Sequence, residues 1–481
     1  MNNPQTKIDS TKEAFYEMGQ EQVFRFWNDL NQSQRTGLLN QLKQISLEEC
    51  LQAWNDIQDR AKKFTNPSPP VPENGIDPLN ESLNEYWHLG EELISQNKVA
   101  AFTVAGGQGT RLGHNGPKGT LGCTPLKNSS LFEKFAGNLK FFAKRFGETP
   151  RWFIMTSHSN YQETVQFFSQ HDYFGLNQER VSFFKQGMMP VFDLEGKILL
   201  EEKDRILMSP NGHGGAFRAL SDSGALSQMQ QEEIEYLSYF QVDNPLVYCI
   251  DPTFIGLHHA RKSEMSSKAV QKVHANEKVG TFVKLNGKLN VVEYSDIPNE
   301  LSSELAETGD LKYRLGSIAI HLLNRSFIEK IATTEEKLNR LHYHGALKSV
   351  SYLDTEGKHQ KPDSQNALKP ETFIFDALPS AQNPLVLEID RNEEFAPIKN
   401  PQGSDSLQSS HILQIQRNQK WLMEERFTEV PEKIEISPLC GPTRRHFTEQ
   451  ISKKPLNSKL LSKETLILEN FEKTASNQEN Y

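Results

Sequence analysis

The sequence has few cysteines and no long apolar run, and each absence narrows the class of protein. Its four cysteines are widely spaced and form no C-x-x-C motif; they are Cys50, Cys123, Cys249 and Cys440. This usage indicates a reducing, cytoplasmic compartment rather than a secreted fold held by disulfides. No stretch of about 18 apolar residues, the length that crosses a bilayer, is present. The polar start MNNPQTKIDS predicts no signal peptide, so we expect no membrane partner.

The sequence also contains fewer basic than acidic residues. The 481 residues include 53 lysines and arginines against 62 aspartates and glutamates, which gives a net charge of −9. Proteins that bind nucleic acid in general are normally basic, so this balance argues against nucleic acid as a partner. The length predicts about two or three domains with a large core.

Two widespread nucleotide-binding motifs are missing, although a glycine-rich loop is present. Residues 99–104 form a continuous apolar run, typical of a parallel strand buried on both faces. The loop GGQGTR follows at 106–111, and Lys118 comes a few residues later. Leu112 stands where a dinucleotide fingerprint needs its third glycine. The lysine lies between proline and glycine, which is the wrong register for a P-loop.

This strand and its loop nevertheless indicate a phosphate-binding site. Glycines let the backbone approach an anion closely and turn several N–H groups toward it. Arg111 and Lys118 add local positive charge in an acidic chain, which suits a small anionic ligand. The alternative is a strand-to-helix turn whose charges are incidental.

Strand and helix patterns alternate from residue 99 onward. This alternation predicts an α/β fold with a mostly parallel, Rossmann-like mixed sheet and helices on both faces. Ligands of such folds bind beyond the carboxyl ends of the strands, which is where the glycine loop lies. The expected strands are 99–105, 151–156, 181–184, 246–250, 279–285 and 290–294, and the expected helices are 129–146, 160–171, 215–229 and 253–262.

Changes in composition divide the chain into three expected parts. Residues 1–98 form an N-terminal region, with helices over 11–64 and a proline-rich linker after them. Residues 99–402 form the main domain. A polar stretch then precedes a small C-terminal domain and tail at 403–481.

Further motifs follow the glycine loop, and together they resemble one family. The loop reads AGGQGTRLGxxxPKG over 105–119. The chain resembles the eukaryotic-type UDP-N-acetylhexosamine pyrophosphorylases, within the wider UDP-sugar pyrophosphorylase family, over residues 15–440 or so. The other matching motifs are MTS at 155–157, FFKQGMMP at 183–190, LEEK at 200–203, MSPNGHGG at 208–215, VDN at 242–244, DPTFIG at 251–256, VVEYS at 291–295, KPD at 361–363, FIFD at 373–376 and DRNEEFAPIKN at 390–400.

The resemblance implies a nucleotidyltransferase fold of the GT-A-like type and a reaction. UTP and N-acetylglucosamine 1-phosphate, or N-acetylgalactosamine 1-phosphate, give UDP-N-acetylhexosamine and pyrophosphate, with Mg²⁺ or Mn²⁺ as cofactor. An oxygen of the sugar phosphate attacks the α-phosphorus of UTP in line with the leaving pyrophosphate, so positioning and charge neutralisation dominate catalysis. The expected partners are these substrates and products, and the expected assembly is a monomer or a weak homo-oligomer.

The resemblance also implies roles for particular residues on the nucleotide side. Arg111, Lys118 and Lys399 are the expected catalytic cations, and Asp243 is the expected metal ligand, since Mg²⁺ prefers oxygen. By itself, an aspartate after a strand is more often a cap or turn residue. The expected UTP contacts are Val104, Ala105, Gly106, Gly107, Lys118, Gln186, Gly212, Asp243 and Lys369.

On the sugar side, the chain departs from the family pattern at two places. The expected contacts are His213, Gly280, Glu293, Tyr294, Ser317 and Lys399. The acetylhexosamine enzymes usually have asparagine at the position of His213, whereas relatives that use glucose or many sugars more often have histidine. Ser317 replaces an asparagine that touches the acetamido group. Polar groups discriminate strongly between substrates, so a UDP-glucose or broad-specificity pyrophosphorylase is the alternative. A nucleotide-sugar-binding regulatory protein without activity is the alternative of another class.

Overall fold

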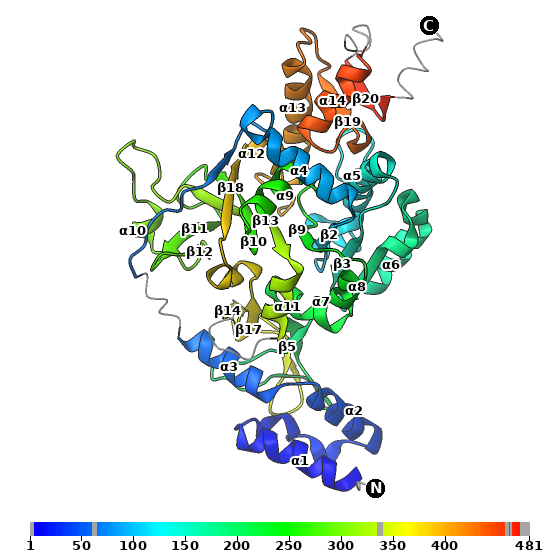
Figure 1. Cartoon of the computed structure of the whole chain (residues 1–481). Helices are drawn as coiled ribbons and strands as arrows, with labels where there is room; N and C mark the ends of the chain where they lie inside the picture. The colour runs from blue at the N-terminus through cyan, green and yellow to red at the C-terminus, as the bar shows by residue number, and fades with distance from the viewer. Residues whose placement is uncertain (1–3, 60–64, 334–339, 457–460, 462–463, 472–481) are drawn as a thin grey trace. The chain divides into compact units, whose positions relative to one another are not determined.

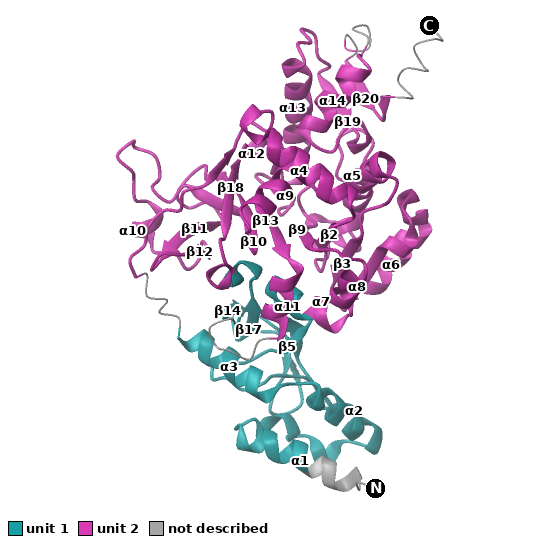
Figure 2. Cartoon of the chain, in the orientation of Figure 1, with its two compact units in different colours: residues 1–64, 186–218, 334–377 teal, residues 65–185, 219–333, 378–481 magenta. Residues whose placement is uncertain are grey.

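The computed structural model describes residues 4–59, 65–333, 340–456, 461 and 464–471. The chain forms two compact units, and each combines segments that are distant in the sequence (Figure 2). Unit 1 comprises residues 1–64, 186–218 and 334–377, and unit 2 comprises residues 65–185, 219–333 and 378–481. The three consecutive parts expected from composition stay a prediction.

Unit 2 is built on a mixed sheet, ten-stranded within the described residues (Figure 1). Along the main path, five neighbouring pairs are parallel, and only β13 runs antiparallel to both of its neighbours. In order, the path is β1 (Glu73–Gly75), β18 (Leu385–Ile389), β10 (Met265–Gln271), β13 (Leu315–Asn324), β9 (Tyr236–Gln241), β2 (Val99–Val104), β3 (Trp152–Thr156) and β4 (Val181–Lys185). The antiparallel strands β11 (Gly280–Leu285) and β12 (Lys288–Val292) join through β13. The predicted fold class is confirmed.

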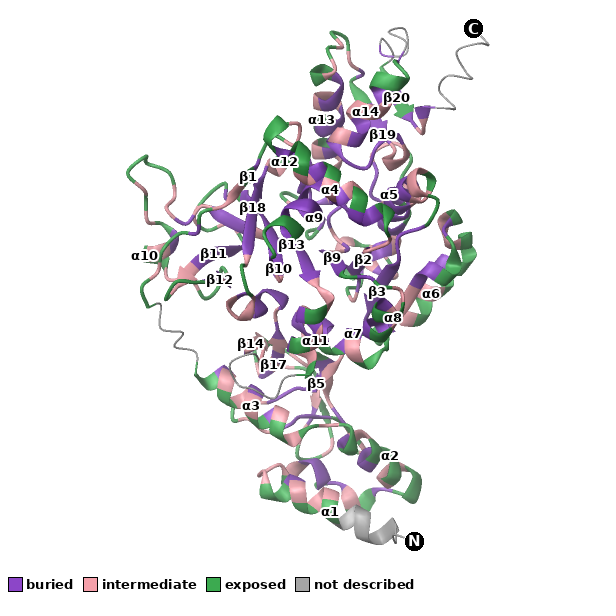
Figure 3. Ribbon diagram, viewed as in Figure 1, coloured by how far each residue is buried: buried purple, intermediate pink, exposed green. Residues whose placement is uncertain are grey.

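Helices cover this sheet, and their ends follow local sequence signals. In α5 (Leu131–Phe146), the Ser130 hydroxyl accepts the Glu133 N–H at 3.1 Å, and Gly147 ends the helix at φ 86°. The apolar side of α5 joins a core that includes Phe132, Phe135 and Trp152. Figure 3 draws the central strands of unit 2 largely in the buried colour. The other longer helices of unit 2 are α4 (Asn84–Ser95), α6 (Tyr161–Gln170), α8 (Ala225–Gln231), α9 (Pro252–Ala260), α11 (Arg325–Thr333), α13 (Leu407–Glu424) and α14 (Arg444–Lys453).

One predicted strand is wrong, and several strands were not predicted. Residues 246–250 are buried but form no strand, because the Asn244 side chain accepts the Leu246 N–H at 3.2 Å and turns the chain out of the sheet. A short buried apolar run looks the same in a sequence whether or not it is a strand. The strand lies just before it, as β9. Sequence analysis also missed β1, β10, β13 and β18, which belong to the same sheet.

The C-terminal segment of unit 2 has its own small core. Strands β19 (Lys433–Ile436) and β20 (Thr465–Leu468) pair in parallel. Trp421 of α13 and Phe447 of α14 pack against each other, with ring centroids 5.2 Å apart. This cluster also includes Tyr248, which ties it to the turn after β9.

Unit 1 combines N-terminal helices with short strands. As predicted, residues 11–59 are mainly helical, whereas 60–64 lie outside the described residues. Ser46 caps the third helix by accepting the Glu49 N–H at 3.2 Å. Its helices are α1 (Pro4–Glu17), α2 (Gln32–Lys43) and α3 (Leu47–Gln58), and its strands are β5 (Met188–Pro190), β6 (Leu200–Glu202), β7 (Arg205–Ile206), β8 (Met208–Pro210), β14 (Tyr343–Lys348), β15 (Tyr352–Leu353), β16 (His359–Gln360) and β17 (Ala367–Thr372). One boundary between the two units in the sequence falls within α7 (Ala216–Asp222). In the described part of the chain, no helix is long and apolar enough to cross a bilayer.

Candidate active site

The glycine loop leaves the carboxyl end of β2, a central strand of the sheet. Its two ends are tied together, because the Gly107 carbonyl accepts the Lys118 N–H at 3.0 Å and the Gly109 N–H donates to the Gly116 carbonyl at 2.9 Å. Gly116 has φ 135°, a conformation that side-chain-bearing residues rarely adopt. A Cβ on Gly107 would meet nothing closer than the Lys118 side chain at 3.9 Å, so the backbone there is open to a ligand.

A buried asparagine stabilises this loop by hydrogen bonds to two of its backbone carbonyls. Asn160 is fully buried, and its amide donates to the Ala105 carbonyl at 2.9 Å and to the Gly107 carbonyl at 3.2 Å. Its own oxygen accepts from the backbone N–H and the hydroxyl of Ser157. Sequence analysis missed this residue. The available signal was that an irregular loop after a buried strand must find partners for its carbonyls.

The loop brings Lys118 to Asp243. Strands β2 and β9 are parallel neighbours, so their carboxyl ends meet at one edge of the sheet, where Asp243 follows β9. The Lys118 ammonium lies 3.4 Å from the Asp243 carboxylate, and the two side chains are 14% and 15% exposed. Arg111 lies in the short helix Thr110–Leu112 of the same loop and is exposed. The structure therefore brings Lys118 and Asp243 together and places Arg111 in the same loop as Lys118.

Lys399 reaches this edge through the backbone. The buried segment 395–398 precedes it, and the Ile398 N–H donates to the Asp243 carbonyl at 2.9 Å. The Lys399 side chain is exposed, and its ammonium lies 5.7 Å from the centroid of the Phe395 ring. This hydrogen bond places the backbone next to Lys399 beside Asp243. The role of Lys399 in the site stays a prediction.

Three predicted sugar contacts also lie together. Gly280 of β11 pairs directly with Ser317 of β13. A Cβ on Gly280 would lie 3.7 Å from a carboxylate oxygen of Glu293, so this acid faces the glycine. Tyr294 follows it and is 48% exposed. A Cβ on Gly280 would also lie 2.5 Å from the Val291 side chain, so this position is closely packed. The Ser317 hydroxyl and the Glu293 carboxylate are the polar groups that could bind a sugar.

The predicted sugar contacts Gly280 and Ser317 lie close to the strand end that leads to Asp243, because β13 pairs with both β11 and β9. Strand β13 pairs with β10 on one edge. On its other edge, it pairs first with β11, at Gly316 and Ser317, and then with β9, from His321 to Asn324. The end of β9, which leads to Asp243, thus lies next to the start of β11 at Gly280. Between the two pairings, β13 is irregular and Ala319 has φ 55°. Such irregularities often lie beside active sites.

Unit 1 holds the remaining predicted residues. Strands β5 and β8 pair antiparallel, and the Asn211 N–H donates to the Gly187 carbonyl at 3.2 Å just beyond them. This register sets Gln186 opposite Gly212. A side chain on Gly212 would meet the Thr372 carbonyl at 2.3 Å, and its φ of 82° also requires glycine.

His213 is fixed in one orientation. Its Nδ1 accepts the Ile374 N–H at 3.2 Å, and its ring stacks on Phe373 with centroids 5.3 Å apart. Burial lowers the pKa of His213 from 6.5 to about 4, against an opposing effect of Asp376. The ring is thus neutral at pH 7, with its proton on Nε2. Its Nε2–H is a hydrogen-bond donor, as is the asparagine amide that the resemblance leads one to expect there.

Lys369 lies elsewhere in unit 1. It pairs with Ala346 between β17 and β14 and lines an open cavity of about 480 Å³. Glu201, Glu202 and His359 line the same cavity. Neither Gln186 nor Gly212 lines it, so the structure does not bring Lys369 to these two residues through this cavity.

The described residues contain no group of three or more histidines, cysteines or acids arranged to hold a metal ion. Asp243 is a single carboxylate beside an open loop. That arrangement fits Mg²⁺, which commonly uses one or two carboxylates together with substrate phosphates and water. It does not fit a metal held by the protein alone.

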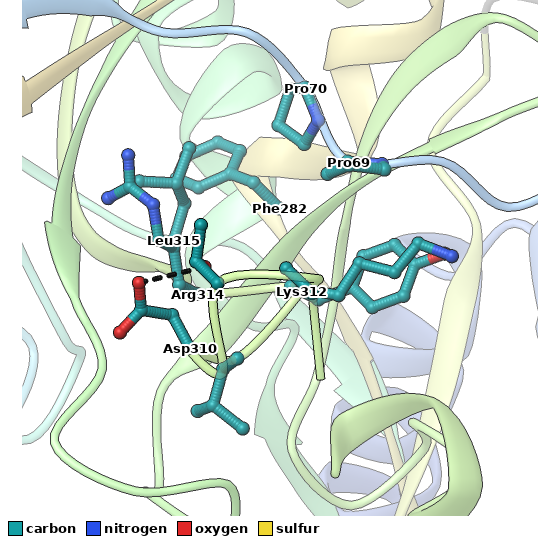
Figure 4. Close-up of a pocket in the computed structure, with 11 residues that line it drawn as sticks. Pro69, Pro70, Phe282, Asp310, Lys312, Arg314 and Leu315 are labelled. Atoms are coloured by element: carbon teal, nitrogen blue, oxygen red, sulfur yellow. Dashed lines mark hydrogen bonds between the residues drawn. The ribbon is translucent and has the colours of Figure 1, made fainter. Parts of the chain in front are cut away.

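A cavity of about 230 Å³ in unit 2 does not coincide with the candidate site (Figure 4). It lies among Pro69, Phe282 and Leu315, and none of the predicted site residues lines it. Its charged groups already have partners: Arg314 pairs with Glu388, Lys312 with Glu304, and Asp310 accepts from the Thr308 hydroxyl. Ligand cavities usually exceed about 300 Å³, so we assign no ligand to this cavity.

A family model described as UTP–glucose-1-phosphate uridylyltransferase matches residues 55–455. The chain belongs to this family. The predicted enzyme class, a UTP-dependent sugar-1-phosphate uridylyltransferase, is confirmed, as is the resemblance on which it depended.

Named relatives of this uridylyltransferase extend over most of its length. The UDP-N-acetylglucosamine pyrophosphorylase of Saccharomyces cerevisiae is 36% identical over 439 residues, 86% of this chain and 91% of the relative. The UDP-N-acetylhexosamine pyrophosphorylase-like protein 1 of Xenopus tropicalis is 35% identical over 414 residues, 82% and 81% of the two chains. A solved structure of the UDP-N-acetylglucosamine pyrophosphorylase of Trypanosoma brucei has a TM-score of 0.80 at 24% identity, covering 96% of this chain and 98% of its own. At that identity, the similarity supports the fold alone.

Proposed function

We propose that this uridylyltransferase converts UTP and N-acetylglucosamine 1-phosphate, or N-acetylgalactosamine 1-phosphate, into UDP-N-acetylhexosamine and pyrophosphate. The observation that carries the proposal is the Lys118–Asp243 pair at the ends of β2 and β9, next to the Gly280–Ser317 pair. A cation and a carboxylate for phosphates thus lie beside polar groups for a sugar. The names of the relatives favour an N-acetylated sugar.

In this proposal the protein works by positioning and by charge. A phosphate oxygen of the sugar 1-phosphate attacks the α-phosphorus of UTP, and the bond from that phosphorus to the pyrophosphate oxygen breaks. Arg111 and Lys118 bind the triphosphate and neutralise the charge that grows on the leaving pyrophosphate. Lys399 holds the sugar phosphate in line for attack.

Asp243 would hold the metal ion, Mg²⁺ or Mn²⁺, together with phosphate oxygens and water. When bound, the ion would neutralise negative charge at the α-phosphate. Lys118 pairs with Asp243 in the structure. A metal ion at Asp243 would compensate this carboxylate, and Lys118 would then neutralise phosphate charge.

Other residues would set recognition. The backbone from Val104 to Gly107 is proposed to contact the nucleotide. In unit 1, we propose Gln186, Gly212 and Lys369 as further UTP contacts. For the sugar we propose His213, Gly280, Glu293, Tyr294 and Ser317. All four cysteines are buried and free, which supports a reducing, cytoplasmic compartment. A monomer or weak homo-oligomer remains our proposal for assembly.

A second candidate function has specific support. His213 and Ser317 differ from the asparagines expected in acetylhexosamine enzymes, and the serine side chain is shorter than that of asparagine. These differences favour a UDP-glucose or broad-specificity pyrophosphorylase as the alternative.

The test compares pyrophosphate release from UTP and Mg²⁺ with three acceptors, the 1-phosphates of N-acetylglucosamine, N-acetylgalactosamine and glucose. We expect both N-acetylated acceptors to react faster than glucose 1-phosphate. Faster release with glucose 1-phosphate would favour the alternative. UTP binding without turnover of any acceptor would point to a regulatory protein and contradict both enzymatic proposals.

A further inference from the structure

Asn244 lies directly after Asp243, and its side chain has three buried hydrogen bonds. It is 4% exposed. Its amide donates to the Glu394 carbonyl at 2.6 Å, and its oxygen accepts the Ala396 N–H at 3.0 Å and the Leu246 N–H at 3.2 Å. One side chain thus joins the turn after β9 to the segment that leads to Lys399.

That segment needs such a partner. Residues 395–398 are buried but belong to no strand or helix, so their backbone groups lack the partners that a sheet would supply. Asn244 takes the place of a neighbouring strand by contacting a carbonyl and an N–H two residues apart. The Ile398 N–H then donates to the Asp243 carbonyl at 2.9 Å, which continues the same pairing toward Lys399.

Glu394, whose carbonyl accepts from Asn244, is also held by its side chain. Lys268 is fully buried, and its ammonium donates to both carboxylate oxygens of Glu394 at 2.5 and 2.7 Å and to Asp251 at 2.6 Å. Glu394 is therefore held by its side chain from the sheet strand β10 and by its carbonyl from Asn244. The segment 395–398 therefore begins at a residue that is anchored to the sheet.

We propose that Asn244 is a positioning residue that sets the place of Lys399 relative to Asp243. The inference rests on the proposed function, in which Asp243 holds the metal ion and Lys399 the sugar phosphate. The Lys399 side chain is exposed. Its ammonium can act in the transition state only if the backbone of Lys399 is held at the right distance from the reacting phosphates. Asn244 supplies that placement without contacting any substrate.

The test uses the full chain and steady-state pyrophosphate release. For Asn244→Ala we expect kcat to fall about 10- to 100-fold, as is typical when a partner that orients a metal-site residue is lost. The Kd for UTP, measured by calorimetry without the sugar phosphate, should change little. Asn244→Ser keeps a hydroxyl that can accept from Leu246 but cannot span to both Glu394 and Ala396. This variant therefore keeps the hydrogen bond within the turn and loses the two hydrogen bonds to Glu394 and Ala396. We expect it to lower kcat as well, and it replaces the alanine variant if that variant does not fold.

Two comparisons separate positioning from a structural effect. Ser410→Ala is the matched control, because the buried Ser410 hydroxyl donates to the Ala396 carbonyl at 2.8 Å on the same segment but has no link to Asp243. We expect this variant to lower the melting temperature with a much smaller loss of kcat. A loss equal to that of Asn244→Ala would overturn the proposal.

A double-mutant cycle with Lys399→Ala supplies the second comparison. If Asn244 acts through Lys399, its substitution should cost much less turnover in the Lys399→Ala background, so the two effects are not additive. Additive losses would overturn the role of Asn244 while leaving the proposed function intact. If Lys399→Ala itself has wild-type turnover, the role of Lys399 in the proposed function is refuted. The positioning role of Asn244 is then refuted as well.

Discussion

The Lys118 ammonium lies 3.4 Å from the Asp243 carboxylate, although the two residues are 125 positions apart in the chain. The pairing of β2 with β9 causes this contact, because parallel neighbours present their carboxyl ends at the same edge. One strand contributes the cation through its loop, and the other contributes the acid.

Replacing either member of this pair should reduce turnover. We expect Lys118→Ala and Asp243→Ala each to lower kcat at least ~10²-fold, through lost stabilisation of charge in the transition state. Asp243→Ala should also raise the Mg²⁺ concentration needed for half-maximal rate. Steady-state pyrophosphate release over a Mg²⁺ titration measures both effects.

A matched control exists at the opposite end of β2. Lys98 precedes this strand and pairs with Glu233 at 3.2 Å on the surface. Lys98→Ala removes a lysine–carboxylate pair of the same chemistry, and we expect near wild-type turnover. A rate for Lys118→Ala close to that of this control would refute the catalytic role of Lys118.

Asn160 should affect UTP binding because it supports the backbone of the glycine loop. In Asn160→Ala, the Ala105 carbonyl loses its buried donor, which costs about 1–3 kcal/mol for one unsatisfied group. The Gly107 carbonyl also loses this donor but keeps the Lys118 N–H. We expect a clear rise in the KM for UTP, with a smaller change in the KM for the sugar phosphate. Initial rates at varied UTP measure it.

Asn138 is the control for this substitution. It is another buried asparagine of unit 2, and its amide donates to the Lys134 carbonyl within α5, away from the loop. Asn138→Ala should lower thermal stability without a selective change in the KM for UTP. Equal changes in both variants would mean that Asn160 has only a structural role.

The sequence alone could predict those parts of the site that are encoded locally. The apolar run of β2 and the glycines after it specify a strand and an anion-binding loop within a few residues, and Lys118 lies inside that pattern. Asp243 was expected at a strand end and lies at one, even though the strand predicted nearby, 246–250, is wrong. Its buried apolar residues pack in the core from an irregular segment.

Contacts between distant segments could not be predicted in this way. Gly280 and Ser317 were proposed for the sugar from resemblance, but their direct pairing depends on β13, a strand that the alternation did not reveal. Asn160 and Asn244 resemble ordinary turn residues in the sequence. Their roles appear only when the partners of buried carbonyls and N–H groups are traced across the fold.

Ser317 offers a direct test of sugar preference. Ser317→Asn restores the longer amide opposite Gly280, which can hydrogen-bond an acetamido group. We expect the ratio of kcat/KM for N-acetylglucosamine 1-phosphate to that for glucose 1-phosphate to rise, whereas Ser317→Ala should not raise it. An unchanged ratio in Ser317→Asn would show that this position does not contact the acetamido group.

His213 should contribute to the pH dependence of folding stability. Its pKa is about 4 in the folded protein against 6.5 normally, because burial disfavours the charged ring. Above pH 6.5 both states are neutral there, so the group has no effect. As the pH falls from 6.5 toward 4, the unfolded chain takes up a proton that the folded chain refuses, and stability falls.

The matching variant is His213→Asn, which does not titrate in this range. Urea unfolding at several pH values between 7 and 5 should show a smaller loss of stability in the variant than in the wild type. Subtracting the two curves removes the contributions of other buried histidines, such as His258. Parallel curves would contradict the assigned burial of the His213 ring.

We expect this uridylyltransferase to prefer an N-acetylated sugar. A competition experiment measures this preference most directly, with equal concentrations of N-acetylglucosamine 1-phosphate and glucose 1-phosphate in one reaction with limiting UTP and Mg²⁺. The ratio of the two UDP-sugars, determined by mass spectrometry at low conversion, equals the ratio of their kcat/KM values. We predict an excess of UDP-N-acetylglucosamine. An excess of UDP-glucose would contradict the proposed preference for an N-acetylated sugar.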